Sequence, residues 1–485
     1  MSEISTWWPQ PEMFYAERDH RTKLSIAAIA RYANIPIEIS VDPEAAARAS
    51  VQLIAVLAAN ITSRWARNIR VYVPEVALHT RLQRDHYLLL KDRIISEMRA
   101  ADPFGRFEVV GPDSPRVEQS LRLFIGPWHG DKKSLTDNDY LVHATQWSVI
   151  GQRGNSLDFD ASSEASVAAS GLAAAIGAGD LFKRAVGHPK EHWISNFCWN
   201  LGSHQLISDT SPQRTIARAD IESRAVTHQL NVGKTLIAGV GAIGSALTYL
   251  LDALELEGSL TVLDRDRVEL SNLNRSPLFT VRHTLRKELK TTAVADYLNK
   301  RTLKVDKLDG TWREHSDSLW EREWDTWISF TNEDAAWAEL PFALPPVVLQ
   351  GTTTSGWGIG AGRHIPKIED CTLCRMPRPE AQFRGPCSEG QIEVDKSGAE
   401  LRASLPFLSV ASAALVLAEF ERLSSGVVLQ TPNDIAADFQ YGLPAVLALR
   451  RKYNQNCRGC RAVQIPLWKL RGGNSCYTFL SEGQV

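Results

Sequence analysis

A glycine-rich turn lies just past the middle of this 485-residue chain. Gly239, Gly241 and Gly244 have the spacing GxGxxG and overlap the apolar segment TLIAGV, a pattern that predicts a strand, a turn and a helix. Glycines at this spacing let the backbone approach a phosphate, and a helix start offers unpaired N–H groups and the positive end of a dipole. Asp264 ends the next apolar segment, where a carboxylate can bind ribose hydroxyl groups. The pattern predicts a nucleotide site.

The residues after Asp264 favour a triphosphate as the ligand. Asn272, Arg275 and Lys290 supply polar and cationic groups, and Arg and Lys bind phosphate oxygens through charge-assisted hydrogen bonds. A dinucleotide-dependent oxidoreductase shares the glycine turn and the acidic residue and stays an alternative. Such an oxidoreductase would not require the polar segment SNLNR that follows Asp264.

The segment DRDRVELSNLNRSPLF resembles the D-x-D-x-[VI]-E-x-S-N-L-N-R-Q pattern of the ubiquitin-activating superfamily, the ThiF/MoeB-like adenylating enzymes. The resemblance implies an α/β fold with a Rossmann-like adenylation domain that binds ATP and Mg²⁺. It assigns catalytic phosphate contacts to Arg275 and Lys290. The other implied ATP contacts are Gly239, Gly241, Gly244, Asp264, Asp266 and Asn272.

This chain departs from the family pattern at two places. Ser276 stands where the family usually has Gln. Asn332 stands where the family normally has an Asp that holds magnesium, and Glu333 and Asp334 are the nearby carboxylates that can replace it. A catalytically inactive scaffold that keeps the fold therefore stays open as an alternative function.

Two CxxC pairs lie far apart in the sequence, Cys371 with Cys374 and Cys457 with Cys460. Tetrahedral zinc prefers four thiolates, and each CxxC places two of them on one turn. The spacing predicts a structural Zn²⁺ site, and the resemblance implies the same arrangement. A redox function of either pair is possible but would leave the presence of the other pair unexplained.

Cys387 differs from these four because it lies in the polar, turn-rich segment FRGPCSEG. An exposed thiol near Arg384 can be partly ionised, and the thiolate is the nucleophilic form. The resemblance implies that the cysteine that receives the activated carrier as a thioester lies between the first CxxC and the following helix, and Cys387 is the only cysteine there. A loop cysteine without function is the alternative. Cys198 and Cys476 have apolar neighbours and are predicted to be structural.

Composition excludes several classes of function. Lys plus Arg (54) nearly balances Asp plus Glu (56), so no basic field indicates a nucleic-acid or membrane partner. No apolar stretch of about twenty residues occurs, and the N-terminus lacks the features of a signal peptide. We therefore expect a cytoplasmic protein. Seven cysteines in such a chain favour metal binding or catalysis over disulfides.

The N-terminal part has its own α/β periodicity, with expected helices at 45–61 and 81–95 and strands at IRVYVP, FEVV and LRLFIG. No glycine-rich phosphate turn follows these strands. Two alanine-rich segments, 170–186 and 409–423, are candidates for equivalent helices of a duplicated unit. The resemblance implies an inactive adenylation-like domain at 1–225 and an active one at 226–485 that contains a cysteine loop at about 375–404. An unrelated α/β domain at 1–225 stays possible.

The resemblance implies a function as well. A ubiquitin-like carrier protein would be adenylated at its C-terminal carboxylate, joined to Cys387 as a thioester and passed to a ubiquitin-conjugating-type enzyme, with a second active or inactive half completing a pseudo-dimer or homodimer. Arg214, Arg218 and Arg224 are candidates for an additional phosphate-binding arginine. A sulfur-carrier adenylyltransferase without a thioester is an alternative. The short segment between Cys374 and 405 resembles bacterial relatives of the Bil type, which are encoded in antiviral operons.

Overall fold

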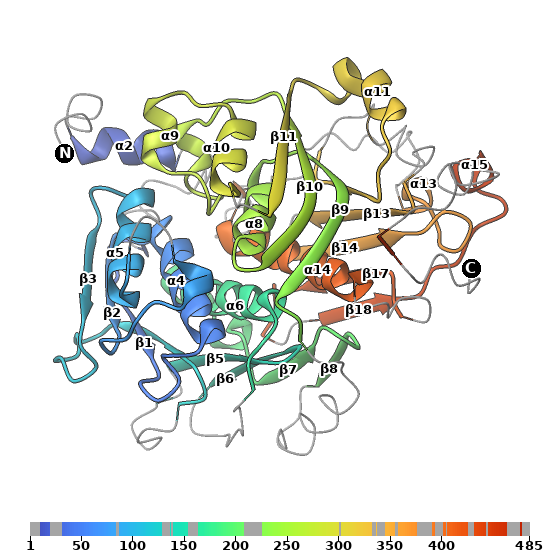
Figure 1. Ribbon diagram of the computed structural model, residues 1–485. Coiled ribbons are helices and arrows are strands. Elements are labelled where there is room, and N and C mark those ends of the chain that lie inside the picture. The colour runs from blue at the N-terminus through green and yellow to red at the C-terminus, as the bar shows by residue number, and fades with distance from the viewer. Residues whose placement is uncertain are drawn as a thin grey trace.

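The computed structural model describes most of the chain as two α/β units (Figure 1). The described residues are 10–19, 32–83, 87–128, 136, 139–153, 163–207, 226–299, 302–331, 336, 345–354, 357–375, 390–392, 401–403, 405–424, 431–442, 445–462 and 476–477.

The first unit is built on an eight-stranded sheet. Its strands are β1 (Ile37–Val41), β2 (Asn68–Tyr72), β3 (Arg106–Val110), β4 (Leu121–Ile125), β5 (Asp139–Thr145), β6 (Ser148–Arg153), β7 (Phe197–Asn200) and β8 (Gln205–Ile207), in the order β3-β2-β1-β4-β5-β6-β7-β8. The neighbouring strands β3, β2, β1, β4 and β5 run parallel to one another. Strands β6, β7 and β8 are each added antiparallel to the strand before. Its helices are α2 (Pro11–Arg18), α4 (Ala49–Ser63), α5 (Leu90–Ala101) and α6 (Val167–Ala185).

The second unit repeats this topology with the order β11-β10-β9-β12-β13-β14-β17-β18. The strands are β9 (Gln229–Ala238), β10 (Glu255–Asp264), β11 (Leu303–Asp309), β12 (Thr326–Ser329), β13 (Val347–Thr353), β14 (Gly358–His364), β17 (Asp434–Asp438) and β18 (Ala445–Leu449). The helices are α8 (Ala242–Leu251), α9 (Val281–Leu285), α10 (Lys290–Tyr297), α11 (Trp312–Glu321), α13 (Thr372–Arg375), α14 (Pro406–Ser424) and α15 (Arg458–Ala462). A separate pair of short strands, β15 (Gly390–Ile392) and β16 (Leu401–Ala403), lies within the expected cysteine loop.

Each element of the first sheet has a counterpart in the second. α4 follows the first strand of its unit as α8 follows β9, and α6 lies between β6 and β7 as α14 lies between β14 and β17. The two alanine-rich segments singled out in the sequence are therefore equivalent helices. The expected fold class, a Rossmann-like α/β unit preceded by a related α/β unit, is confirmed. The boundary expected at residues 225 and 226 falls between β8 and β9 and stays a prediction.

The two units meet through helices that are almost entirely buried. α4 packs on α6, α6 on α14, and α14 on α8, between the sheets (Figure 1). Small residues permit this approach, because a Cβ at Gly171 would lie 2.7 Å from a methyl carbon of Leu250 and one at Gly179 would lie 3.2 Å from the Phe407 ring. A continuous apolar core therefore joins the two units.

Two helices of the first unit begin later than their sequence patterns indicate. The expected helix at 45–61 begins at Ala49 as α4. The pattern predicts a helix over 81–95, but α5 begins at Leu90. The residues just before it pair with the segment at 76–78 instead, because Leu78 N–H donates to the carbonyl of Leu88 at 2.7 Å and Leu90 N–H donates to the carbonyl of Val76 at 3.1 Å. Pairing with another part of the chain thus overrides the local helical periodicity.

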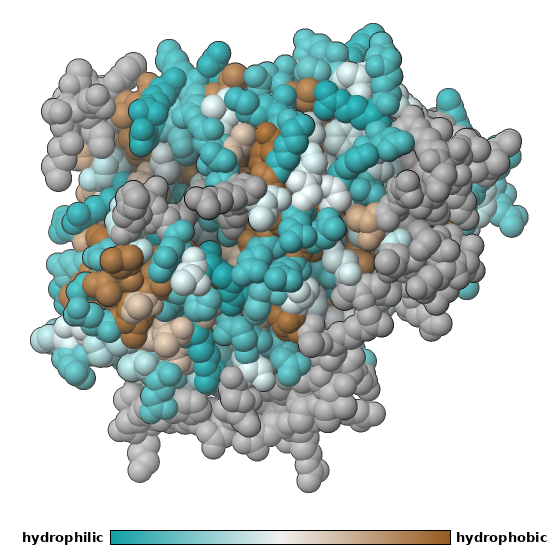
Figure 2. Space-filling view, viewed as in Figure 1, coloured by the Kyte–Doolittle hydropathy of each residue, from teal (hydrophilic) through white to brown (hydrophobic). Residues whose placement is uncertain are grey.

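The visible face of the molecule is largely hydrophilic, with a hydrophobic area over the region of α4 and α5 (Figure 2). Within the described residues, no helix has both the length and the apolarity to cross a bilayer.

Candidate functional site

Two of the three glycines are required by the packing of the turn after β9. Gly239 has φ +87°, which side chains rarely adopt, and its Cβ would lie 2.8 Å from the backbone nitrogen of Thr331. A Cβ on Gly244 would lie 2.2 Å from the carbonyl oxygen of Gly239. The turn is therefore pressed against the end of β12 on one side and against the first turn of α8 on the other.

Gly241 has a different environment. It is the N-cap of α8, with φ −73°, and a Cβ there would meet no atom of the described residues within 4 Å. With respect to these residues the space in front of this helix start is open, and the backbone N–H groups of its first turn have no partner within the helix. Gly241 thus permits the close approach of a ligand rather than the packing of the protein.

Gly241 and Gly244 should therefore respond differently to substitution. Gly244→Ala is expected to lower the melting temperature, because the new methyl group collides with backbone. Gly241→Ala is expected to leave the melting temperature unchanged within about 2 °C while weakening ATP binding by roughly tenfold or more. Thermal unfolding and calorimetric ATP titration measure the two effects. Equal losses of stability in both variants would contradict the distinction.

Asp264, the last residue of β10, connects that strand to the glycine turn. One carboxylate oxygen accepts the N–H of Val240 at 2.8 Å, and the other accepts the N–H of Asp266 at 2.9 Å. Burial raises the pKa of Asp264 above its usual value, and the positive charge of Lys290 opposes this. Each carboxylate oxygen can accept a further hydrogen bond, so the side chain is able to bind hydroxyl groups beside the turn.

Lys290 begins α10 and is buried, with its Nζ 2.7 Å from a carboxylate oxygen of Asp266. Its backbone N–H also donates to the carbonyl of Asp266 at 3.0 Å. The carboxylate of Asp266 is about half exposed, so it can be displaced or shared when an anionic ligand arrives. The structure thus brings Lys290, Asp266, Asp264 and the glycine turn into one connected group.

Asn272 and Arg275 lie on the next turn and are buried. Asn272 ends a short 3₁₀ helix, η5 (Leu270–Asn272), and its Oδ1 accepts the N–H of Glu269 at 2.9 Å. The backbone N–H of Arg275 donates to the carbonyl of Asn272 at 3.1 Å. The side chain of Asn272 therefore has a local structural contact in addition to the phosphate contact that the sequence predicts.

The first unit has no equivalent cradle. The turn after β1 reads Asp42-Pro43-Glu44, without glycine. The N–H of Ser50, in the first turn of α4, donates to a carboxylate oxygen of Glu164 at 2.6 Å, and Arg81 lies 3.4 Å from the same oxygen. A carboxylate of the chain itself thus binds the helix start that corresponds to the open one at Gly241.

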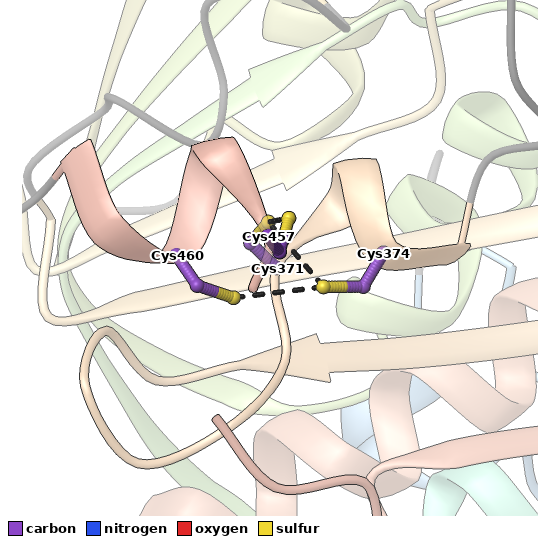
Figure 3. Close-up of side chains that lie close together, drawn as sticks. All are labelled: Cys371, Cys374, Cys457 and Cys460. Carbon is purple, nitrogen blue, oxygen red and sulfur yellow. Dashed lines mark hydrogen bonds between the residues drawn. The ribbon is translucent and has the colours of Figure 1, made fainter. Parts of the chain in front are cut away.

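The four CxxC cysteines converge from two short helices, α13 and α15, and from the residue just before each of them (Figure 3). The sulfur atoms of Cys371 and Cys457 are 3.6 Å apart, those of Cys374 and Cys460 are 3.5 Å apart, and all four lie within 4.8 Å of one another. Tetrahedral zinc with Zn–S distances of about 2.3 Å requires sulfur atoms about 3.8 Å apart. The cluster has the composition and dimensions of a Cys₄ zinc site.

Without a cation, the buried thiols of this cluster resist ionisation. Burial raises the pKa of Cys371, and it raises that of Cys374 to about 12. Four adjacent thiolates would repel one another, so a divalent ion is needed to stabilise the ionised form. A structural zinc ion therefore stays our prediction for this cluster.

Removal of the cluster should reduce stability. Cys371→Ser is expected to abolish binding of about one zinc per chain and to lower the melting temperature by roughly 5 °C or more, because the ion joins α13 to α15. Elemental analysis and thermal unfolding check this. Cys476→Ser, in a cysteine outside the cluster, should keep the full metal content. A metal-free wild-type protein of normal stability would contradict the assignment.

Several predicted residues lie outside the described part of the chain. These are Cys387, Asn332, Glu333, Asp334, Arg214, Arg218 and Arg224. Cys198 is buried in β7, as expected for a core cysteine.

The sequence also matches a known family. Residues 213–328, which include the glycine turn, Asp264 and Lys290, match the model of the ThiF family. The chain contains a ThiF-family domain. The predicted resemblance to the ubiquitin-activating-like superfamily is therefore confirmed for this domain, whereas the Bil-type relationship stays a prediction.

Similarity to solved structures is weaker. Two crystal structures of E. coli MccB, one with SeMet MccA and one with succinimide, each show 16% identity and a TM-score of 0.36. Each covers 47% of this chain, and the chain covers 67% and 66% of them. This likeness is too low to assign an activity. No curated protein matches the chain significantly.

Proposed function

We propose that this protein is an adenylating enzyme that activates the C-terminal carboxylate of a small ubiquitin-like carrier protein. The observation that carries the proposal is the connected group in the ThiF-matched segment: an open helix start at Gly241, Asp264 bonded to the glycine turn, and a buried Lys290 beside them. This group offers N–H donors and a cation for phosphates and an acceptor for ribose hydroxyls. ATP fits this set of contacts better than a nicotinamide does.

The chemistry requires positioning and charge stabilisation rather than a protein nucleophile. A carboxylate oxygen of the carrier attacks the α-phosphorus of ATP, the bond to the β-phosphate oxygen breaks, and pyrophosphate leaves. The products are an acyl-adenylate and pyrophosphate. Lys290, Arg275 and the N–H groups of the turn neutralise the charge that accumulates on the phosphate oxygens.

Magnesium, when bound, would neutralise phosphate charge further. The glycine turn lies against Thr331. In the sequence, Asn332 and the candidate ligands Glu333 and Asp334 follow this residue directly. Carboxylates are suitable Mg²⁺ ligands, and Asn332 is a weaker one because its amide is neutral.

Product analysis tests the proposal. The protein, ATP, Mg²⁺ and a ubiquitin-like carrier ending in Gly-Gly should yield AMP and pyrophosphate, and only when the terminal carboxylate is free. A carrier with an amidated C-terminus is the matched control. Formation of ADP and phosphate would overturn the proposal, and so would formation of AMP and pyrophosphate with the amidated carrier.

We further propose that Cys387 attacks the carbonyl carbon of the acyl-adenylate and displaces AMP, forming a thioester that a conjugating enzyme can accept. Support comes from the sequence, where Cys387 is the only cysteine between Cys374 and α14. Cys387→Ala is expected to abolish the thiol-reducible carrier adduct while ATP–pyrophosphate exchange stays within about twofold of wild type. Gel analysis with and without reductant, together with the exchange assay, checks both parts. An adduct that persists in the variant would place the nucleophile elsewhere.

Two alternative functions lead to different results in the same assays. A sulfur-carrier adenylyltransferase would exchange pyrophosphate without forming the adduct. A scaffold, which Asn332 at the magnesium position favours, would bind the carrier and form no AMP. The inactive role of the first unit is supported by its occupied helix start at Ser50 and Glu164.

A further inference from the structure

A buried arginine of the first unit contacts the segment of the second unit that contains Arg275. Arg64 follows the last turn of α4 and is 1% exposed. Its Nη1 donates to the carbonyl of Leu273 at 2.7 Å, and its Nη2 donates to the carbonyl of Pro277 at 2.6 Å and to that of Phe279 at 3.2 Å. One side chain thus holds three carbonyl groups of a single segment.

Neighbouring residues of the first unit fix the guanidinium in place. Its Nε donates to Oδ1 of Asn60 at 2.8 Å. The amide nitrogen of Asn60 donates to the Pro277 carbonyl at 3.1 Å and to a carboxylate oxygen of Glu97. Among the described residues, no carboxylate forms a direct ion pair with Arg64, so carbonyl and amide oxygens alone satisfy its donors. Burial of such a charge is costly unless these bonds are kept.

The bonded carbonyls lie on both sides of Arg275. Leu273 is two residues before it and Pro277 is two residues after it. The side chain of Arg275 is itself buried, so a shift of this backbone would move the guanidinium as a whole. We propose that Arg64 is a positioning residue, contributed by the first unit, that holds the segment from Leu273 to Phe279 so that Arg275 meets the phosphates of ATP. This inference rests on the proposed adenylation.

A second buried cation provides a matched control. Lys183, on α6 of the first unit, donates to the carbonyl groups of Phe439 and Gln440 in the second unit. It therefore makes the same kind of contact between the units, but with the segment after β17 and not with the turn of Arg275. Lys183→Met should affect stability without a specific effect on the reaction.

The experiment compares Arg64→Ala, Arg64→Lys, Lys183→Met, Arg275→Ala and the double variant Arg64→Ala/Arg275→Ala by carrier-dependent ATP–pyrophosphate exchange and thermal unfolding. Because a displacement of about 1 Å can cost on the order of a hundredfold in rate, Arg64→Ala should lower kcat by roughly that factor. Lys183→Met should stay within about threefold of wild type. Arg64→Lys keeps a cation but cannot hold three carbonyls at once, so an intermediate loss of roughly tenfold is expected.

The double variant separates positioning from general stability. If Arg64 acts through Arg275, the double variant should be no more than about twofold slower than Arg275→Ala alone. Losses that multiply, or a full rate in folded Arg64→Ala, would overturn the inference. If Arg64→Ala does not fold, a full rate in Arg64→Lys overturns it and a specific loss there supports it. Absence of exchange in the wild type would instead refute the proposed function.

Discussion

Lys290→Ala is expected to lower the rate of ATP–pyrophosphate exchange by on the order of a hundredfold to a thousandfold, the usual effect of removing one charge-stabilising group. Lys290 is buried at the start of α10. Its ammonium group pairs with Asp266, and the N–H of Asp266 donates to Asp264, which is bonded to the glycine turn. A cation so placed stabilises charge that develops on the phosphates, and its loss leaves Arg275 and the N–H groups of the turn to do so without it. Steady-state exchange at saturating ATP measures the effect.

The fold should tolerate this substitution, because the partner carboxylate of Asp266 is about half exposed and can be solvated by water. Lys234→Ala is the matched control. Lys234 also pairs with a carboxylate, that of Glu323 at 3.1 Å, but its side chain is exposed where that of Lys290 is buried. An equal loss of rate in both variants would show that the effect is one of general charge and not of the site.

Asp264→Ala is expected to weaken ATP binding by roughly a hundredfold, since hydrogen bonds to a charged group contribute about 1.5–3 kcal/mol each and ribose offers two hydroxyl groups. The variant also removes the acceptor of the Val240 N–H and so loosens the glycine turn. Calorimetric titration with an ATP analogue measures the affinity.

Two comparisons sharpen this test. Asp306→Ala, in a surface aspartate on the neighbouring strand β11, should bind ATP normally. AMP and ATP should lose affinity by similar factors in Asp264→Ala, because both carry the ribose. A loss confined to ATP would place Asp264 at the phosphates, and unchanged affinity for both would refute the ribose assignment.

The candidate site was predictable from the sequence where its determinants are local. The spacing of Gly239, Gly241 and Gly244 reflects contacts within one turn, and Asp264 ends the strand that pairs with the one before that turn. The two CxxC pairs were likewise readable, although 86 residues separate Cys371 from Cys457. Residue type and local spacing carry the information at these positions.

Other parts depend on contacts that no local pattern encodes. The bond from Ser50 to Glu164 spans 114 residues, and the bond from Arg64 to Pro277 spans 213. The first bond joins two distant segments of the first unit. The second arises because the units pack through α4, α6, α8 and α14, so Arg64, at the end of α4, acquires its partners only in the folded chain. The late start of α5 has the same origin, since pairing with Val76 and Leu78 decided the conformation of residues that look helical.

The two units share a topology but differ at the helix start that follows their first strand. One presents an open helix start at Gly241, and the other fills the equivalent position with the carboxylate of Glu164. We infer that one unit binds the nucleotide and the other supports it, with Arg64 as a direct contact from the supporting unit to the turn of Arg275.

The most direct test of this account is a crystal structure of the protein with a non-hydrolysable ATP analogue and Mg²⁺. The account predicts a triphosphate against the N–H groups from Gly239 to Gly244 and near Lys290, with the ribose hydroxyls on Asp264. Absence of the analogue from this site at saturating concentration, or preferential binding of NADH there in a competing soak, would contradict it.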